Sequence, residues 1–241
     1  MLPAYNTVKF DNVDLNTFGV FVTGSGTYNA PERAVSVVEV PGRSGDLVFD
    51  DGRYKNITLS YPCFITGTNG NSFETNFRNL KGFLFSRPLY SRIEDTYHPD
   101  EFRLGYYKGP LTVTPEQFTV SAMQLDFICK PMRYLKSGET GTQFTSNGSV
   151  TNPSYMTSKP LLRIYGAGTV TLGSYEVVVD SHEYDYVDVD SELMDCHYGS
   201  NNLNSKVTFS SGFPEITSGE HGINLGTGIT KVIVTPRWWV L

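Results

Sequence analysis

Acidic side chains concentrate in residues 180–195, and they are the first candidates for chemistry. The members of this stretch are Asp180, Glu183, Asp185, Asp188, Asp190, Glu192 and Asp195, with His182 and His197 nearby. A calcium-binding loop needs oxygen ligands at positions 1, 3, 5 and 12 and a glycine at position 6. Counted from Asp185 or from Asp188, the sixth position holds no glycine. The spacing therefore does not predict a calcium loop.

The pattern inside this stretch favours a strand with one wet face. Asp188 and Asp190 alternate with Val187 and Val189, and side chains of a strand point alternately to its two sides. We therefore expect both aspartates to face solvent. A glycosidase is the sharper alternative, since it uses two carboxylates across a cleft, but the stretch does not single out such a pair.

Other catalytic signatures are missing from the sequence. The nucleophile elbow G-x-S-x-G is absent, because Gly42-Arg43-Ser44-Gly45 has the wrong spacing. The histidines show no metal-ligand spacing. The sequence predicts no enzyme activity, no metal and no cofactor.

Trp238 and Trp239 are the remaining candidates for ligand contact. On a strand they face opposite sides, so we expect one to pack on a core and the other to lie beside Arg237 or another neighbour. The alternative is a platform on which a sugar or a protein partner stacks, since the negative face of an aromatic ring attracts C–H groups. That alternative would make the chain a carbohydrate-binding module.

The elements that must position these residues are mostly strands. The chain has 241 residues, 13% of them aromatic, with 23 glycines and 13 prolines, a mixture typical of short strands and tight turns. Apolar residues alternate over 57–65 and 123–129. Cys63 and Cys129 lie in these segments, and we expect buried free thiols, with a disulfide as the alternative.

One segment has helical spacing instead. Phe73, Phe77, Leu80 and Leu84 fall on one face of a helix predicted over 72–85. We expect Asn71 to cap it, with Glu74 completing a capping box and Pro88 ending the element. The amphipathic pattern predicts that this helix lies on a sheet.

A hairpin with apolar residues on both faces is predicted around the segment 35–49. The apolar positions of its first strand are Val35, Val37, Val38 and Val40. The connecting loop consists of Pro41, Gly42, Arg43, Ser44, Gly45 and Asp46. Such a hairpin must be buried by something, for which another subunit is a candidate. Asp51-Gly52 predicts a second turn, leading into the strand at 57–65.

The composition changes after residue 136, and it predicts two domains, 1–136 and 137–241. Residues 137–154 are rich in Ser, Thr, Gly and Asn, which is typical of a linker that runs into a first, weakly patterned strand. Short strands are predicted beyond it at 161–165, 170–172, 175–179, 186–189, 207–209 and 231–234. Their spacing favours a β-sandwich.

Charge and hydropathy exclude several classes of protein. The net charge is −6, and there is no cluster of Lys and Arg of the kind that binds duplex DNA. No apolar run approaches the roughly 20 residues of a membrane span, and residues 1–12 do not read as a signal peptide. We expect a soluble protein made in a cytoplasm.

Several motifs, in order, resemble the distal tail protein family of siphophages. In the first half they are VPGRSGDLVFDDGRYKNITLSY, SRIEDTYHPDEFRLGYY and FTVSAMQLDFICKPMRYL. In the second half they are KPLLRIYGAGTVTLGSY, YVDVDSELMDCHYG, GFPEITSGEHGINLG and ITKVIVTPRWWVL. The resemblance spans nearly the whole chain.

The resemblance implies a mainly β protein with two β-sandwich-type domains. The N-terminal one would carry one helix and a projecting belt hairpin, mapped here onto 35–61, and the C-terminal one would be galectin-like. It implies that six copies form a ring at the distal end of a phage tail, assembled in the cytoplasm of the bacterial host. The implied partners are other copies of the chain, the tail tube protein, and tail tip, baseplate or receptor-binding proteins. Neither specific nucleic-acid binding nor a membrane is implied.

Overall fold

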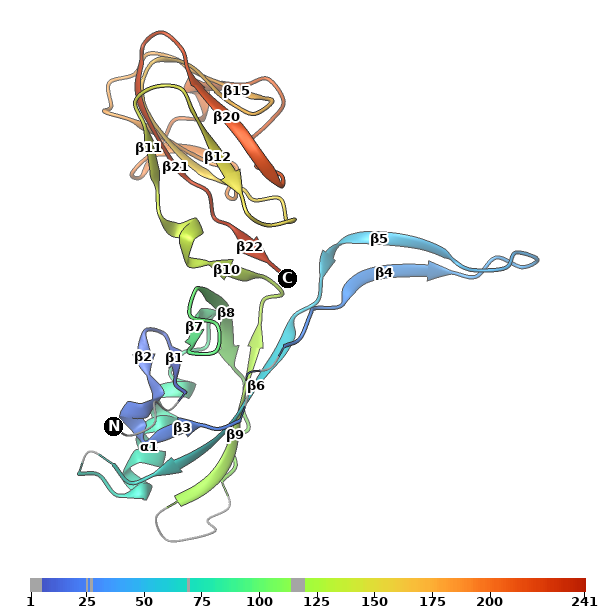
Figure 1. The fold of residues 1–241 in the computed structure, drawn as a ribbon, viewed down its shortest axis with the longest axis vertical. Helices are drawn as coiled ribbons and strands as arrows, with labels where there is room; N and C mark the ends of the chain where they lie inside the picture. Colours follow the sequence, from blue (N-terminus) through green and yellow to red (C-terminus); the bar gives the residue numbers. More distant parts are fainter. Residues whose placement is uncertain (1–5, 25, 27, 69, 114–119) are drawn as a thin grey trace. The chain divides into compact units, whose positions relative to one another are not determined.

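The computed structural model describes residues 6–24, 26, 28–68, 70–113 and 120–241. Residues 1–5, part of the segment 1–12 that was tested above for a signal peptide, lie outside the described residues. The chain divides into two compact units: unit 1 comprises Met1–Arg133 with Leu241, and unit 2 comprises Tyr134–Val240. Both consist mainly of strands (Figure 1), and the described residues contain one α-helix. The predicted fold class is confirmed. None of the described helices is long and apolar enough to span a membrane.

Unit 1 is built on one antiparallel sheet with the strand order β2-β1-β7-β8-β9-β6-β3. Its strands are β1 (Val8–Phe10), β2 (Val13–Asp14), β3 (Val20–Val22), β6 (Ile57–Thr66), β7 (Ser91–Asp95), β8 (Glu101–Tyr107) and β9 (Val120–Cys129). A short 3-10 helix, η1 (Leu15–Phe18), precedes β3. β6 and β9 pair along their whole lengths, and every second residue of each is buried. The predicted alternation is therefore confirmed in both strands.

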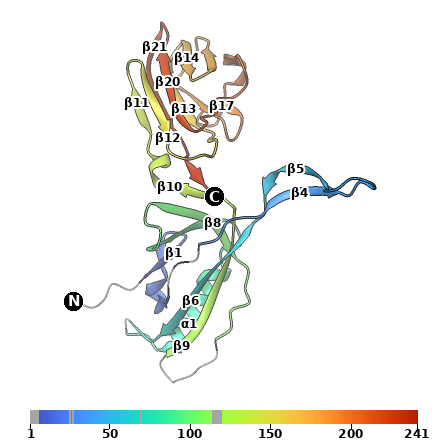
Figure 2. The ribbon, with the colours of Figure 1, turned by 45° about the vertical axis from the view of Figure 1, so that its right-hand side comes forward.

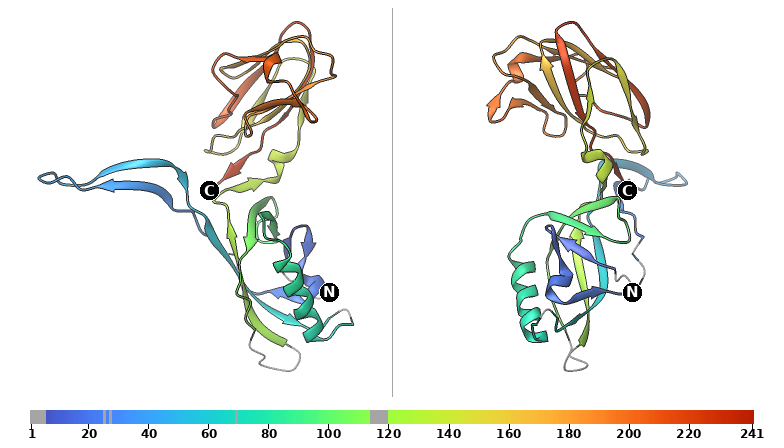
Figure 3. Two further views of the ribbon diagram at one scale, coloured as in Figure 1. Left: turned by 180° about the vertical axis from the view of Figure 1, so that it is seen from behind. Right: turned by 60° about the vertical axis from the view of Figure 1, so that its left-hand side comes forward.

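The helix α1 (Phe73–Phe85) lies against this sheet (Figures 2 and 3). Leu80 and Leu84 are fully buried in the core, and the two predicted phenylalanines pack at its margin. The predicted cap was wrong by one residue. Ser72, not Asn71, has the extended backbone of an N-cap, and its Oγ accepts a hydrogen bond from the Thr75 N–H at 3.3 Å.

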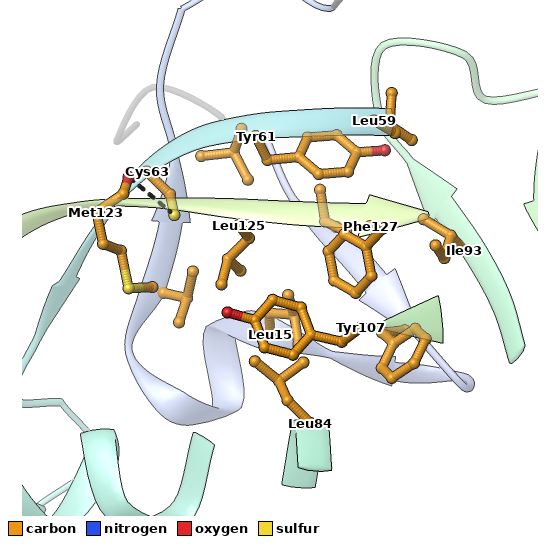
Figure 4. Packing of buried hydrophobic residues seen from close by; sticks show 14 of the residues in the cluster. Leu15, Leu59, Tyr61, Cys63, Leu84, Ile93, Tyr107, Met123, Leu125 and Phe127 are labelled. Carbon is orange, nitrogen blue, oxygen red and sulfur yellow. Dashed lines mark hydrogen bonds between the residues drawn. The ribbon is translucent and has the colours of Figure 1, made fainter. Parts of the chain in front are cut away.

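The core of unit 1 fills the space between the sheet and its covering elements (Figure 4). Phe127 is at its centre and packs against Phe10 and the rings of Tyr61 and Tyr107. All three cysteines of the chain are buried free thiols. Cys63 Sγ lies 3.6 Å from the carbonyl oxygen of Met123. The sequence prediction of free thiols is confirmed, and burial raises the pKa of Cys63 to about 12.

Unit 2 consists of two facing antiparallel sheets. One has the order β11-β21-β13-β16-β17-β18 and the other β12-β20-β14-β15-β19. The strands are β11 (Thr142–Phe144), β12 (Gly148–Asn152), β13 (Leu161–Gly166), β14 (Gly168–Leu172), β15 (Tyr175–Val179), β16 (Val187–Asp190), β17 (Asp195–Tyr198), β18 (Asn201–Asn202), β19 (Val207–Phe209), β20 (Gly219–Leu225) and β21 (Ile229–Thr235). Apolar residues of both sheets form one core. Five of the six segments predicted as strands lie within observed strands, and the sixth, 186–189, begins one residue before β16.

The linker predicted in the segment 137–154 was wrong, but the weakly patterned strand expected there is confirmed. The segment contains the end of a 3-10 helix, η2 (Lys136–Glu139), and the strands β11 and β12. Both strands lie at sheet edges and are mostly exposed, so they need few apolar residues. Unit 2 also contains η3 (Asn204–Lys206), and β10 (Arg133–Leu135) pairs with β22 (Trp239–Val240).

Candidate functional site

A long hairpin extends from unit 1 and forms a sheet of its own (Figures 1 and 3). It consists of β4 (Arg33–Val38), β5 (Leu47–Tyr54) and the connecting residues 39–46. We call the whole hairpin the arm and residues 39–46 its tip. In the described part of the chain β4 and β5 pair with each other and with no further strand. The arm therefore has two free edges.

Both faces of the arm expose apolar side chains. These side chains are 42% to 63% exposed and belong to Val35, Val37, Val38, Val48 and Phe49. Val37 lies opposite Val48, so these two share one face, while Phe49 lies on the other. A two-stranded hairpin alone is marginally stable in water, and contiguous exposed apolar surface marks an interaction site. The geometry fits a segment that is covered by another molecule.

The tip closes through a tight turn. The Arg43 N–H donates to the Val40 carbonyl oxygen at 3.1 Å. Gly42 and Gly45 have φ values of +81° and +84°, a region that favours glycine. Val40 is half-buried, whereas Pro41, Arg43 and Asp46 are exposed. The predicted interface residues of the arm thus lie along one strand and its tip.

The predicted turn at Asp51-Gly52 was wrong, because both residues lie inside β5. Val35 pairs with Asp50, and Arg33 pairs with Tyr54. Between these two pairs one residue of β4 therefore lies opposite three residues of β5, which is a bulge. Gly52 adopts a φ of +70°, and its N–H donates to Asp50 Oδ1 at 2.9 Å. The Asp-Gly pair shapes this bulge rather than a chain reversal.

Polar contacts hold the base of the arm. Arg33 is hydrogen-bonded to Asp50, and its Nη2 donates to Tyr54 Oη at 2.8 Å. The Gly52 N–H, together with Arg33, lowers the pKa of Asp50. Lys55 Nζ lies 2.8 Å from Glu32 Oε1. These groups are exposed, so the pairs contribute little stability; they fix how the two strands meet.

The aspartates expected on a wet face are buried instead. Asp188 and Asp190 are each 4% exposed. Arg163 donates to both oxygens of Asp188 at 2.7 and 2.8 Å, and Arg237 donates to both oxygens of Asp190 at 2.7 Å. The two guanidinium groups cover this side of β16 and exclude water. Carboxylates held in this way are not placed as a glycosidase pair. Within the described residues, no group of His, Cys, Asp and Glu could hold a metal ion.

The two tryptophans differ in burial, and only Trp238 packs in a core. Trp238 is 5% exposed and belongs to the core of unit 2. Trp239 is half-buried, and its Nε1 donates to the Thr157 carbonyl oxygen at 2.9 Å. Arg237 pairs with Asp190. Burial therefore removes Trp238 as a sugar platform.

Sequence reasoning missed a polar pocket in unit 1. It is a partly open recess with a cavity volume of about 10 Å³, lined by Tyr61, Ile93, Asp95, His98, Glu101, Phe102, Arg103 and Arg133. These residues come from β6, β7, β8 and the segments next to them. No local spacing could have revealed them, because the sheet brings together residues that are up to 72 positions apart (61 to 133).

The comparisons with known proteins concern the fold. No protein-family model and no curated protein matches the sequence. The crystal structure of the SPP1 Dit protein, described as a paradigm of the hub adsorption apparatus in phages that infect Gram-positive bacteria, matches with a TM-score of 0.71 and 16% identity, covering 99% of this chain and 100% of that one. A chain of the phage p2 baseplate in its activated conformation with Sr aligns at a TM-score of 0.47 and 14% identity, covering 95% and 97% of the two chains. The likeness confirms, at the level of fold, the resemblance read from the motifs: this chain has the fold of the SPP1 Dit protein.

Proposed function

We propose that the chain is the distal tail hub of a siphophage, a structural virion protein that joins the tail tube to the tail tip and its adsorption proteins. The observation that carries the proposal is the likeness of the whole chain to a hub protein of a phage adsorption apparatus. Fold alone does not fix function, but a second, independent feature supports the same role. The arm is built as a surface for another protein.

In the proposed assembly six copies close into a ring, and the arm of each copy packs on its neighbour. A ring is a heterologous assembly, in which one surface meets a different surface on the next subunit. The arm supplies a surface of this kind, because it projects and carries apolar side chains on both faces. Contact with a neighbour would also stabilise the hairpin, which has no core of its own.

The remaining partners follow from the same proposal. The ring would bind the tail tube protein on one side, and tip, baseplate or receptor-binding proteins would dock on its outer parts, at the distal end of the virion tail. DNA would pass through the ring without being held. With a net charge of −6 on every copy, the ring would repel the phosphate backbone. The hub role needs neither catalysis nor a cofactor.

The test is the solution mass of the purified chain. Light scattering on a size-exclusion column should give six times 26.8 kDa, and negative-stain images should show rings. The double variant V37D/V48D places two charges on one face of the arm and should give monomers. The matched control is Leu193→Asp in unit 2, where the side chain is 69% exposed; it should keep the ring.

Two results would count against the proposal. One is a ring in V37D/V48D that is as stable as the wild-type ring, which would exclude the arm as the interface. The other is a wild-type chain that stays monomeric even when mixed with the tail tube and tip proteins of the same phage. A monomer whose tryptophan fluorescence responds to cell-wall sugars would favour the alternative of a carbohydrate-binding module.

A further inference from the structure

The polar pocket of unit 1 contains a buried guanidinium that forms no hydrogen bond to a carboxylate among the described residues. Arg103, on β8, is 6% exposed. Its Nη2 donates to Asn29 Oδ1 at 3.4 Å, a long hydrogen bond to a neutral group, and its Nη1 has no partner among the described residues. A buried ionised group whose donors are not all hydrogen-bonded is destabilising. An additional group that accepts a hydrogen bond from Arg103 Nη1 would therefore stabilise the pocket.

The carboxylates of the pocket are already engaged elsewhere. Asp95 accepts hydrogen bonds from Tyr61 Oη at 2.7 Å and from the His98 N–H at 2.8 Å. Its Oδ1 also lies 3.2 Å from His98 Nδ1. Glu101 pairs with Arg133 at 3.3 Å and acts on Arg103 from a longer range. Neither carboxylate is available to neutralise Arg103 directly.

Arg133, which also lines this pocket, carries a second donor that lacks a partner among the described residues. Its Nη1 is the atom bonded to Glu101, whereas its Nε is buried and has no partner among the described residues. The two guanidinium groups also repel each other. Burial, followed by the charge of Arg133, lowers the pKa of Arg103. Two buried N–H donors with positive charge in one pocket are the chemistry that binds an anion.

We propose that this pocket binds a small monovalent inorganic anion, of which chloride is the physiological example, between Arg103 Nη1 and Arg133 Nε. The pocket is partly open to solvent, and its cavity volume of about 10 Å³ is close to that of one water-sized sphere. This volume favours a single-atom ion over a phosphate or sulfate. A water molecule would satisfy the donors but would place no negative charge in contact with Arg103. The ion would thereby tie β8 to the segment that follows β9.

The first test measures chloride binding directly. The ³⁵Cl NMR line in sodium chloride should broaden in proportion to the concentration of the purified chain, and bromide should reverse the broadening by competition. Arg133→Gln should weaken binding about tenfold or more, since it removes a charged donor. The matched control is Arg87→Gln in the same unit. Arg87 is paired with Asp11 at 2.6 Å and lies outside the pocket, so this variant should bind chloride as the wild type does.

The second test uses stability at constant ionic strength. Replacing sodium gluconate by sodium chloride should raise the melting temperature of the wild type and of Arg87→Gln until the effect saturates. Arg133→Gln should lose the shift. If that variant fails to fold, Arg133→Lys keeps the charge but not the Nε donor, and it should show a reduced shift. A wild type with neither line broadening nor a chloride-specific shift would overturn the proposal in favour of a water-filled pocket. Equal chloride binding by the wild type and the folded Arg133 variant would overturn it as well.

Discussion

Replacing Arg237 by methionine should destabilise unit 2 by an amount that the geometry sets. The guanidinium makes two 2.7 Å hydrogen bonds to Asp190, whose side chain is 6% exposed. Breaking a buried pair costs about 3–5 kcal/mol, because one charge stays buried without its partner. Asp190 keeps two backbone donors, the N–H groups of Glu192 and Leu193. We therefore expect a loss at the lower end of this range, about 3 kcal/mol.

The assay can be confined to unit 2. Both tryptophans of the chain, Trp238 and Trp239, lie there, so urea unfolding followed by tryptophan fluorescence reports on that unit. Methionine has a β-carbon as arginine does, so the backbone strain at the φ of +57° is unchanged. The matched control is Arg33→Met in the exposed pair with Asp50. It should leave this transition unmoved, since it lies in unit 1 and exposed pairs contribute at most about 1 kcal/mol.

The pH dependence gives the sign of the effect. Burial alone would raise the pKa of Asp190, but the hydrogen bonds from Arg237 and from the backbone N–H groups outweigh it, and the net shift is downward. The stabilisation is therefore complete above the unfolded-state pKa of about 3.9 and is lost as the pH falls through the lower folded-state pKa. The difference between wild type and Arg237→Met should shrink in acid. A loss below about 1 kcal/mol at neutral pH, the level of an exposed pair, or a loss that does not change with pH, would refute this reasoning.

Three further predictions concern unit 1 and the thiols. Ser72→Ala should lower the stability of unit 1 by about 0.5–2 kcal/mol in calorimetry, while Asn71→Ala should have a much smaller effect; the reverse order would return the cap to Asn71. Gly105→Ala should destabilise unit 1 by about 1–3 kcal/mol, because the new β-carbon would lie 2.7 Å from Cys129 Sγ; an unchanged melting temperature would contradict this packing. The three cysteines should resist a thiol reagent at pH 8 and react after unfolding in urea, since burial raises the pKa of each to about 12; rapid reaction of the native protein would show that a thiol is accessible.

Period-2 patterning predicted the strands that have one fully buried face. β6 and β9 pair in the middle of the sheet of unit 1, so their alternation is long and regular. β20 carries the pattern GEHGINL, in which Ile223 is its one buried residue, and local patterning cannot separate such a strand from a loop. The segment of β11 and β12 was predicted to hold a single weak strand for the same reason, since each of the two lies at the edge of its sheet.

The features around charged residues depend on distant partners. Asp188 and Asp190 have the alternation of a wet face, but Arg163 and Arg237 lie 25 and 47 positions away and cover them. The burial of Arg103 could not be predicted either, because it follows from the packing of several strands. In contrast, the two apolar faces of the arm could be predicted from the sequence, because they depend only on the alternation of residues within the hairpin and not on contacts with distant residues.

The bulge in β5 constrains how the arm can change in length. Between the pairs Arg33–Tyr54 and Val35–Asp50, one residue of β4 lies opposite three residues of β5. β5 therefore has two extra residues, which is an even number. Side chains alternate with a period of 2, and an even excess keeps both strands in phase on either side of the bulge. Deleting Gly52 alone would invert the faces of Val48 and Phe49 relative to the base, whereas deleting Asp51 and Gly52 together would preserve them. Insertions and deletions at this point should therefore be tolerated when they involve two residues rather than one. Whether the number of extra residues in the bulge is even or odd is then a property by which arms of this kind can be compared.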